Sequence, residues 1–251
     1  MQTVTQILNS FEALTLDQMD AVKLMDRVDT KFAFHANDLE KVLALLKQEY
    51  AVLEINGKRI SAYKSLYFDK KDFDFYNDHH NNKDHRFKVR YRNYVDSALF
   101  FLEIKEKRKG RVKKTRIPVE KIEENLSHIE KQFIEENIPD ASNLEPKLWS
   151  EYQRITLVNL QRNERLTIDT QLLFQWKDEI KKYDDIVIAE LKQEKIDRRS
   201  PFFTIMKEYQ IRPYSISKYC IGTIELHTEK KLKYNRFKSK LLKLKKLKND
   251  Y

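Results

Sequence analysis

Apolar residues recur along the chain with two spacings, one typical of strands and one typical of helices. A two-residue period predicts strands over 27–34, 50–55, 59–69, 86–95, 99–107, 111–119, 152–160, 164–174 and 186–194. Helical spacing predicts helices over 5–26, 37–48, 120–135, 143–150, 201–210, 215–221 and 229–248. No linker rich in Pro, Gly or Ser and no internal repeat interrupts this pattern. The chain therefore reads as a single α+β body.

Charged residues gather on one face of most predicted strands. Strand 86–95 carries four cations on one face, opposite an apolar face, and they are Arg86, Lys88, Arg90 and Arg92. The next two strands repeat the arrangement with Glu103, Lys105 and Lys107 and with Lys114 and Arg116. Three further strands carry Arg27, Asp29 and Lys31, then Arg165, Thr167 and Asp169, then Glu190 and Lys192. Each of these strands has one charged side and one apolar side.

Two arrangements of such strands are open. Half-exposed antiparallel sheets commonly turn their charged face to solvent and their apolar face to a core. The predicted helices, however, also need apolar surface to pack on, and the apolar strand faces are what remains for them. The charged faces would then line the lumen of a closed antiparallel β-barrel of about eight strands, with helices packed outside and a basic C-terminal helix.

A lumen lined in this way would need an anionic guest. Crowded cations repel one another and are costly to remove from water unless carboxylates or a bound anion pair with them. A linear phosphate chain meets that requirement. The chain has only 3 glycines, so it lacks the glycine-rich loops that cradle phosphates in many enzymes, and side chains must hold the phosphate.

The net charge of +10 is concentrated at the C-terminus. Residues 229–251 contribute +8 of it, which leaves residues 1–228 nearly balanced. We therefore divide the chain into a main domain, 1–228, and a basic amphipathic C-terminal helix, 229–251. Phe237, Leu241 and Leu244 form one stripe of that helix among many lysines, which suits contact with an anionic membrane surface or a polyanion. A helix docked on the body by this stripe is the alternative.

Cysteine content and hydropathy bear on the cellular compartment. The single Cys220 excludes an internal disulfide and fits a reducing compartment. The first residues lack a basic region followed by an apolar run, and no stretch approaches 18 consecutive apolar residues. We expect a cytoplasmic protein, with peripheral membrane contact through the basic tail as an option.

Several short segments resemble a known family. In order along the chain they are Arg27-Val-Asp-Thr-Lys-Phe, Leu66-Tyr-Phe-Asp, Lys88-Val-Arg-Tyr-Arg-Asn-Tyr, Phe101-Leu-Glu-Ile-Lys, Lys114-Thr-Arg-Ile-Pro, Tyr152-Gln-Arg, Arg165-Leu-Thr-Ile-Asp-Thr, Ile188-Ala-Glu-Leu-Lys and Ser215-Ile-Ser-Lys-Tyr. Together they resemble the catalytic domain of the vacuolar transporter chaperone (VTC) family, the polyphosphate polymerases of the triphosphate tunnel metalloenzyme (CYTH-like) superfamily. Each segment alone is a weak signal, but their common order over roughly residues 20–225 is fairly specific.

The resemblance implies a set of site residues. In the family a basic tunnel binds the phosphates of ATP and the growing polymer, with a divalent metal on a carboxylate. The resemblance implies that phosphate is contacted by Lys31, Arg90, Arg92, Lys105, Lys114, Arg116, Arg154 and Lys218. We expect a catalytic role for Lys31, Arg90, Arg92, Lys105 and Lys218, and we add Arg27, Lys88, Arg165 and Lys192 as phosphate-binding residues. Glu190 is the expected ligand of Mn²⁺ or Mg²⁺, and Glu103 is a second candidate.

One departure from the superfamily pattern favours a particular activity. Its hydrolases and class IV cyclases usually begin with an E-x-E-x-K strand, whereas the corresponding strand here is Arg27-Val-Asp-Thr-Lys31. We therefore expect an ATP-dependent polyphosphate polymerase whose partners are ATP and polyphosphate, with no sequence-specific nucleic acid. The alternatives are a non-catalytic module that binds polyphosphate, inositol polyphosphate or a nucleotide, and a tunnel-type hydrolase of triphosphate or polyphosphate.

Overall fold

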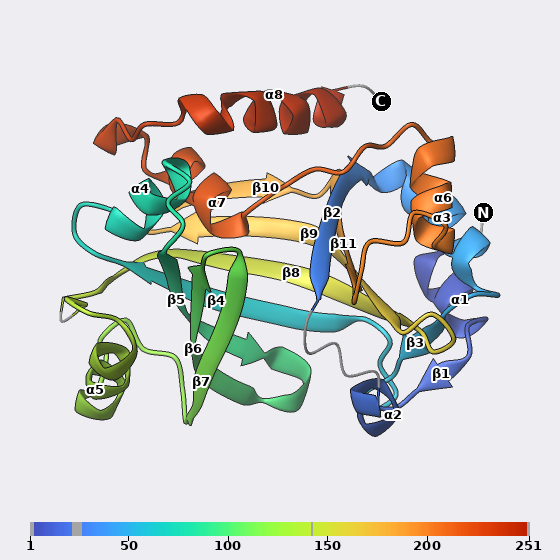
Figure 1. Ribbon diagram of the computed structural model, residues 1–251, viewed down its shortest axis with the longest axis horizontal. Helices are drawn as coiled ribbons and strands as arrows, with labels where there is room; N and C mark the ends of the chain where they lie inside the picture. The colour runs from blue at the N-terminus through green and yellow to red at the C-terminus, as the bar shows by residue number, and fades with distance from the viewer. Residues whose placement is uncertain (1–2, 22–26, 142, 250–251) are drawn as a thin grey trace.

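Eleven strands form one sheet in the computed structural model, which describes residues 3–21, 27–141 and 143–249 (Figure 1). The strands are β1 (Ala13–Leu14), β2 (Val28–His35), β3 (Ala51–Leu53), β4 (Ser61–Asp69), β5 (Arg86–Tyr94), β6 (Leu99–Arg108), β7 (Arg111–Val119), β8 (Glu145–Asn159), β9 (Glu164–Trp176), β10 (Glu179–Tyr183) and β11 (Ile186–Gln193). The α-helices are α1 (Val4–Asn9), α2 (Leu16–Ala21), α3 (Leu39–Leu46), α4 (Asp74–His80), α5 (His128–Asn137), α6 (Pro201–Glu208), α7 (Lys218–Leu226) and α8 (Asn235–Asn249). The expected α+β class is confirmed.

The expected closed barrel is wrong. The strand order is β2-β11-β9-β8-β4-β5-β6-β7, and among the described strands the two end strands, β2 and β7, do not pair with each other. Closure requires every strand to pair along both edges. The long strands β8 and β9 each pair with two shorter strands along one edge. For β8 these are β3 and β4, and for β9 they are β10 and β11. The sheet is therefore open, and antiparallel except for the β1–β3 pair.

The sheet is curved so that its charged face is the inner one. Lys105 of β6 is close enough to Glu190 of β11 and Lys31 of β2 for both to influence its pKa, although these strands lie far apart from β6 in the strand order. On the outer face, α1, α3 and α6 pack with β2, β8, β9 and β11 around residues such as Phe32 and Leu157. Helix α5 covers the outer face of β4, β5 and β6. The helices thus take the apolar strand faces, and the charged faces do not point outward.

Helix α7 closes one end of the inner face. It packs on β8, β9 and β10, and Tyr219, Cys220 and Ile221 are buried there. Gly222 lies so close to the sheet that an added Cβ would be 2.7 Å from the Phe174 ring and 3.0 Å from a Leu148 methyl carbon. Only a residue without a side chain fits at that distance. The N-terminus of α7, capped by the Ser217 hydroxyl, is consequently held against the charged part of the inner face.

Helix α8 docks on the body through the apolar stripe that the sequence predicts. Phe237, Leu241 and Leu244 are buried in the same cluster as α7, and the Phe237 ring lies near Tyr76. In Figure 1, α8 runs across the top of the molecule above α4, α7 and β10. Its exposed side includes Leu242 and several lysines. The apolar stripe is therefore buried against the body, while the lysines outside it are exposed to solvent.

This docking predicts unequal effects for neighbouring leucines of α8. Leu241→Ala should lower the free energy of unfolding by about 2 kcal/mol, because it removes buried apolar contacts at the edge of a core. Leu242→Ala, at a position that is 56% exposed, should change it by less than about 0.5 kcal/mol. Urea denaturation followed by circular dichroism would measure both. Equal effects of the two substitutions would contradict the docked helix.

Some predicted elements differ from the observed ones, each for a physical reason. The predicted helix 143–150 is wrong, because residues from Glu145 onward pair with β4 as the start of β8. The predicted helix 120–135 begins only after the Ser127 cap, which forms a capping box with Glu130. The predicted helix 5–26 is divided into α1, β1 and α2, and its residues 22–26 lie outside the described part.

Candidate functional site

The charged side chains of seven strands form one continuous inner surface, here called the phosphate face. Strand register fixes this arrangement, because residues directly opposite one another in an antiparallel pair share a face. Lys31 lies opposite Glu190, and Glu190 lies opposite Thr167. At the other end of the sheet, Arg90 lies opposite Glu103, which lies opposite Arg116. The phosphate face contains Lys31, Lys88, Arg90, Arg92, Glu103, Lys105, Lys114, Arg116, Arg154, Arg165, Asp169, Glu190, Lys192 and, from α7, Lys218.

Glu190 is held between two lysines. One carboxylate oxygen accepts a hydrogen bond from Lys31, and the other accepts one from Lys192 at 2.8 Å. The Lys192 Nζ also donates to Thr167 Oγ1 at 3.1 Å. Burial alone would raise the pKa of Glu190, but Lys192 and Lys31 outweigh it and hold the pKa well below its usual value. Glu190 is therefore an anion at any pH near neutrality.

Asp169 is a second carboxylate between cations, and it links the sheet to α7. Arg154 donates to its two oxygens at 2.6 and 2.8 Å, and Lys218 Nζ lies 2.5 Å from Oδ2. Lys218 Nζ also lies 4.4 Å from the centre of the Tyr152 ring. Burial opposes ionisation, but Arg154 and Lys218 hold the pKa of Asp169 below its usual range. Lys218 is thus part of the inner surface and not an ordinary surface lysine.

Glu103 holds the third group of cations. Its Oε2 accepts from Arg90 Nε at 3.0 Å and Nη2 at 2.8 Å, and Lys114 Nζ lies 2.5 Å from Oε1. Burial would raise the pKa of Glu103, but Arg90 and Lys114 lower it to about 2. The Tyr67 hydroxyl accepts from Arg90 Nη1 at 3.2 Å, which fixes the guanidinium from its other side. Despite its burial, Tyr67 has a pKa lowered to about 8 by Arg90 and Arg92.

Other cations on the phosphate face have no carboxylate partner among the described residues. Arg92 is buried and lies 5.1 Å from the Tyr63 ring centre and 5.7 Å from that of Tyr152. Lys88 donates to Ser217 Oγ at 3.0 Å. Arg116 lies over Phe101 at 4.4 Å. This part of the inner surface therefore carries an excess of positive charge that no carboxylate within residues 3–21, 27–141 and 143–249 pairs with.

Two predicted residues lie at the margin of this surface. Arg27 precedes β2, is mostly solvated, and its Nε lies 3.2 Å from Asp29 Oδ1. Arg165 lies on β9 opposite Lys192, and is half-buried. Arg27 is thus exposed and paired with Asp29, and not with Glu103, Asp169 or Glu190. Asp169, Tyr67 and Ser217 were not predicted as site residues, although Asp169 shares the charged face of Arg165 and Thr167 in the sequence pattern.

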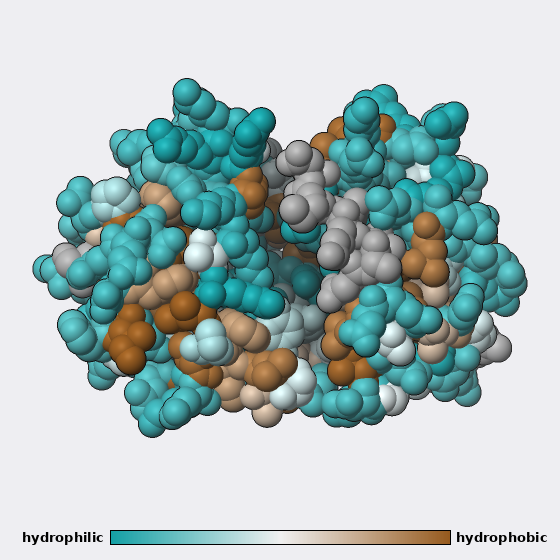
Figure 2. Space-filling view, turned by 60° about the horizontal axis from the view of Figure 1, so that its bottom comes forward, coloured by the Kyte–Doolittle hydropathy of each residue, from teal (hydrophilic) through white to brown (hydrophobic). Residues whose placement is uncertain are grey.

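The phosphate face is accessible from solvent. Lys31 and Arg90 keep 27% and 26% of their side-chain surface exposed. Lys105, Lys114 and Arg116 are more exposed still. Figure 2 shows the molecule hollowed between two lobes, with hydrophilic side chains prominent on the wall at the left. A ligand could therefore reach the cations of β5 to β7 without unfolding of the sheet.

Because of two lysines on this surface, we expect phosphate affinity and protein stability to change in opposite directions as pH rises. Partial removal from water within the hollow of the sheet, together with neighbouring cations, lowers the pKa of Lys88 and that of Lys114 to about 8, although Lys114 keeps 42% of its side chain exposed. Both lose charge as pH rises through 8, so phosphate affinity should fall between pH 7 and pH 9. In the unfolded chain they titrate near 10.5, so between pH 8 and 10.5 the unfolded state binds more protons and these groups make the free protein more stable as pH rises. Affinity by calorimetry and stability by urea denaturation should thus change in opposite directions.

The carboxylates offer limited coordination for a divalent metal. Within residues 3–21, 27–141 and 143–249, no group of three or more His, Cys, Asp or Glu side chains is close enough to hold one. Glu103 is 2% exposed and enclosed by its two cations. Glu190 is 19% exposed and faces the same surface as the phosphate-binding candidates. Because Mg²⁺ is often bound by one carboxylate together with phosphate oxygens and water, Glu190 fits a metal that arrives with phosphate.

Comparison with solved structures gives distant likenesses. A candidate adenylate cyclase from Bacillus halodurans is 14% identical with a TM-score of 0.48, over 76% of this chain and 94% of that chain. A candidate adenylate cyclase from Vibrio parahaemolyticus is 12% identical with a TM-score of 0.49, over 78% and 99% of the two chains. A candidate adenylyl cyclase from Hippeastrum, described by a dominant triphosphatase activity, is 13% identical with a TM-score of 0.48, over 79% and 95%. At these scores the likenesses establish neither a substrate nor an activity for this chain.

Sequence comparison identifies the family. No curated protein matches the chain. The family model of the VTC domain matches residues 26–227. That range includes every strand from β2 to β11 and helix α7, and therefore the whole phosphate face. Among the described residues no helix has the length and apolar character needed to cross a membrane. By this match over most of its length, the chain belongs to the VTC domain family.

Proposed function

We propose that this chain is an ATP-dependent polyphosphate polymerase that transfers the γ-phosphoryl group of ATP to the end of a polyphosphate chain. The observation that supports it most is the unneutralised positive charge of the phosphate face. Among the described residues Arg92 and Lys88 have no carboxylate partner there, and neighbouring cations help to lower the pKa of Lys88 and that of Lys114. A polyanion would relieve that repulsion. Residues 1–228 form the proposed catalytic unit.

For this phosphoryl transfer the protein mainly has to align ATP with the end of the polyphosphate chain and neutralise the phosphate charges. The attacking oxygen of the terminal phosphate is already ionised near neutral pH, so no side chain has to remove a proton from it. The bond between the β-phosphate bridging oxygen and the γ-phosphorus breaks, a new phosphoanhydride forms, and ADP leaves. Arg and Lys side chains stabilise charge on the transferred group. A bound Mn²⁺ or Mg²⁺ would supply further charge neutralisation, with Glu190 as its protein ligand.

The carboxylates support this proposal through the cations that they hold. Glu103 fixes Arg90, Asp169 fixes Arg154 and Lys218, and Glu190 fixes Lys31 and Lys192. Cations held in this way lose little conformational freedom when a phosphate binds, which favours catalysis by pre-organised charge. The aromatic rings of Tyr63 and Tyr152 stack at 5.3 Å beneath Arg92 and Arg154 and add to the same rigidity.

One assay separates this proposal from its two alternatives. The protein is incubated with ATP and Mn²⁺, and long-chain polyphosphate, released phosphate and bound nucleotide are measured. Growth of long chains supports the polymerase. Release of phosphate without chain growth would identify a tunnel-type hydrolase, and saturable binding without either product would identify a binding module for polyphosphate, inositol polyphosphate or nucleotide.

Lys218 offers a local test of the proposed site. Lys218→Met should lower turnover by about 10- to 100-fold, because a charge-assisted hydrogen bond contributes about 1.5–3 kcal/mol. The matched control is Lys207→Met, on the exposed side of α6, which should retain turnover. Steady-state kinetics with ATP as the varied substrate would measure both. Near-normal turnover of a folded Lys218→Met variant would remove Lys218 from the proposed site.

The exposed lysines of α8 support an accessory contact. Lys238, Lys245, Lys246 and Lys248 lie outside its docked stripe. We extend the proposal to contact of this helix with long polyphosphate or an anionic membrane surface. Such contact should weaken as salt rises, since it depends on exposed charge. Co-sedimentation of the Lys238→Glu/Lys245→Glu variant with anionic vesicles, and filter binding of long polyphosphate, would separate the two partners.

A further inference from the structure

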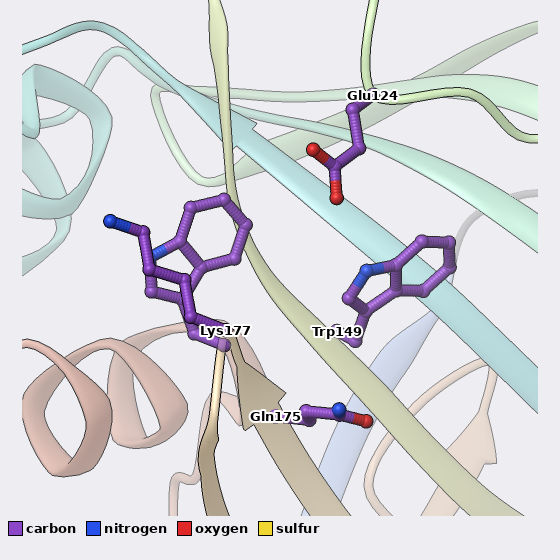
Figure 3. A pocket seen from close by; sticks show the side chains of 5 residues that line it. Glu124, Trp149, Gln175 and Lys177 are labelled. Carbon is purple, nitrogen blue, oxygen red and sulfur yellow. The ribbon is translucent and has the colours of Figure 1, made fainter.

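The two tryptophans of the chain line one small cavity that has no part in the phosphate face. The cavity has a volume of about 200 Å³ and is lined by Glu124, Trp149, Gln175, Trp176 and Lys177 (Figure 3). Trp149 lies opposite Leu66 in the register of β8 and β4, and Leu66 belongs to the outer core beneath α5. The cavity therefore lies away from the inner surface, and the proposed function does not use it.

Strand pairing and a tight turn hold the two indoles at this cavity. Trp149 of β8 lies next to Gln175 of β9, and Trp176 is the last residue of β9. Lys177 follows with a φ of 51°, the left-handed conformation that a two-residue hairpin turn requires, and β10 returns with Glu179 opposite Trp176. Both indoles are half-buried against apolar residues. Their positions are thus determined by backbone structure.

Each tryptophan also packs against a residue that does not line the cavity. Lys64 Nζ lies 4.6 Å from the centre of the Trp149 ring, and the His227 ring lies 5.9 Å from that of Trp176. Between the indoles themselves, the described part of the chain shows no ring contact. The two indoles therefore border the cavity without packing against each other, which leaves the space between them open to a guest.

The charge at the cavity mouth is negative and unpaired. In Figure 3 the carboxylate of Glu124 points into the space beside Trp149, whereas the ammonium of Lys177 points away from it. Glu124 forms no ion pair with another described residue, while its neighbour Glu123 is paired with Lys121. Lys64, whose Nζ lies over the Trp149 ring, is itself paired with Glu151 at 2.8 Å and does not line the cavity. Indole faces and a carboxylate together favour a positively charged guest.

We propose that this cavity binds a quaternary ammonium group. Indole faces attract such groups by cation–π interaction, and Glu124 supplies a compensating charge. A primary ammonium would bring three N–H donors that need acceptors, and among the side chains that line the cavity the acceptors are the Glu124 carboxylate and the Gln175 amide oxygen. A quaternary ammonium has no donor to satisfy. The same chemistry occurs in free choline-type cations and in choline lipid headgroups, which are the guests proposed here; a trimethylated lysine side chain is tested as the alternative.

The experiment uses the intrinsic fluorescence of the full chain. Because the chain has only 2 tryptophans and both line the cavity, emission reports on this site alone. Tetramethylammonium and choline should each give a saturable change in emission. The neutral isostere 3,3-dimethylbutan-1-ol should bind at least about 5-fold more weakly, because it lacks the charge that the rings and Glu124 attract. Sodium chloride at equal ionic strength gives the baseline.

Matched variants test the carboxylate. Glu124→Gln should weaken choline binding by about 5-fold, the effect of about 1 kcal/mol from an exposed charge pair. Glu123→Gln, one residue away and outside the cavity, should leave it unchanged. A trimethyl-lysine peptide and phosphatidylcholine vesicles then distinguish the sources of the group. Absence of a saturable change, an equal response to the neutral isostere, or equal effects of the two Gln variants would each overturn the proposal.

Discussion

Replacing Arg90 and Arg92 with Ala should weaken polyphosphate binding by about 100-fold or more, from the loss of two charged hydrogen-bond donors at about 1.5–3 kcal/mol each. Arg90 is fixed by Glu103 and Tyr67 with a quarter of its side chain still exposed, so it is ready to donate to a ligand. Arg92 is buried beside Tyr63 without a described carboxylate partner. The two lie on one strand and share neighbours, so their effects need not add. Calorimetric titration with polyphosphate of defined length measures the loss.

The control variant removes two cations from the same hairpin without touching the phosphate face. Arg111 is exposed at the β6–β7 turn, and Lys113 lies opposite Glu106 on the other side of the sheet from Lys114. Arg111→Ala/Lys113→Ala should therefore change affinity only slightly. Because Arg92 is buried, Arg90→Ala alone provides a variant that keeps the core intact. Unchanged affinity in folded Arg90→Ala and in the folded double variant would refute the assignment of this surface.

Glu190→Gln should separate turnover from binding. If Glu190 is the protein ligand of the metal, the substitution should lower metal-dependent turnover by about 100-fold, because an amide is a far weaker ligand of Mn²⁺ or Mg²⁺ than a carboxylate. Affinity for polyphosphate should be kept or should increase, since Lys31 and Lys192 lose the anion between them. The free protein should also become less stable, because the buried Lys192 is left without its carboxylate. Kinetics at several Mn²⁺ concentrations and equilibrium binding without metal give the two readouts.

The matched control for this experiment is Glu194→Gln. Glu194 follows β11 directly and is exposed, so the substitution changes the net charge equally without altering the phosphate face. It should retain both turnover and affinity. Loss of polyphosphate affinity in parallel with turnover in Glu190→Gln would show instead that Glu190 acts by positioning Lys31 and Lys192.

The alternation of residue types was enough to predict the faces of the strands. In β5, Lys88, Arg90 and Arg92 share one side because a strand turns successive side chains to opposite faces. In α8 it is the 3.6-residue period of a helix that predicts the apolar stripe, with Leu241 and Leu244 buried as expected. Local periodicity did not show that residues 145–150 are a strand, because the segment Glu145-Pro-Lys-Leu-Trp-Ser does not alternate apolar and polar residues; its pairing with β4 shows the strand.

Residue patterns along the chain are therefore enough to predict local features: which strands are charged on one side, which helical faces are apolar, and, through the ordered segments, the family. Which charges meet depends instead on how the strands and helices pack together. Lys31 and Glu190 are separated by 159 residues and are brought together by the register of β2 with β11. Asp169 meets Lys218 only because α7 folds back onto the sheet. Whether the sheet closes likewise depends on how the long strands β8 and β9 share their edges, and residue periodicity along any one strand carries no information about that.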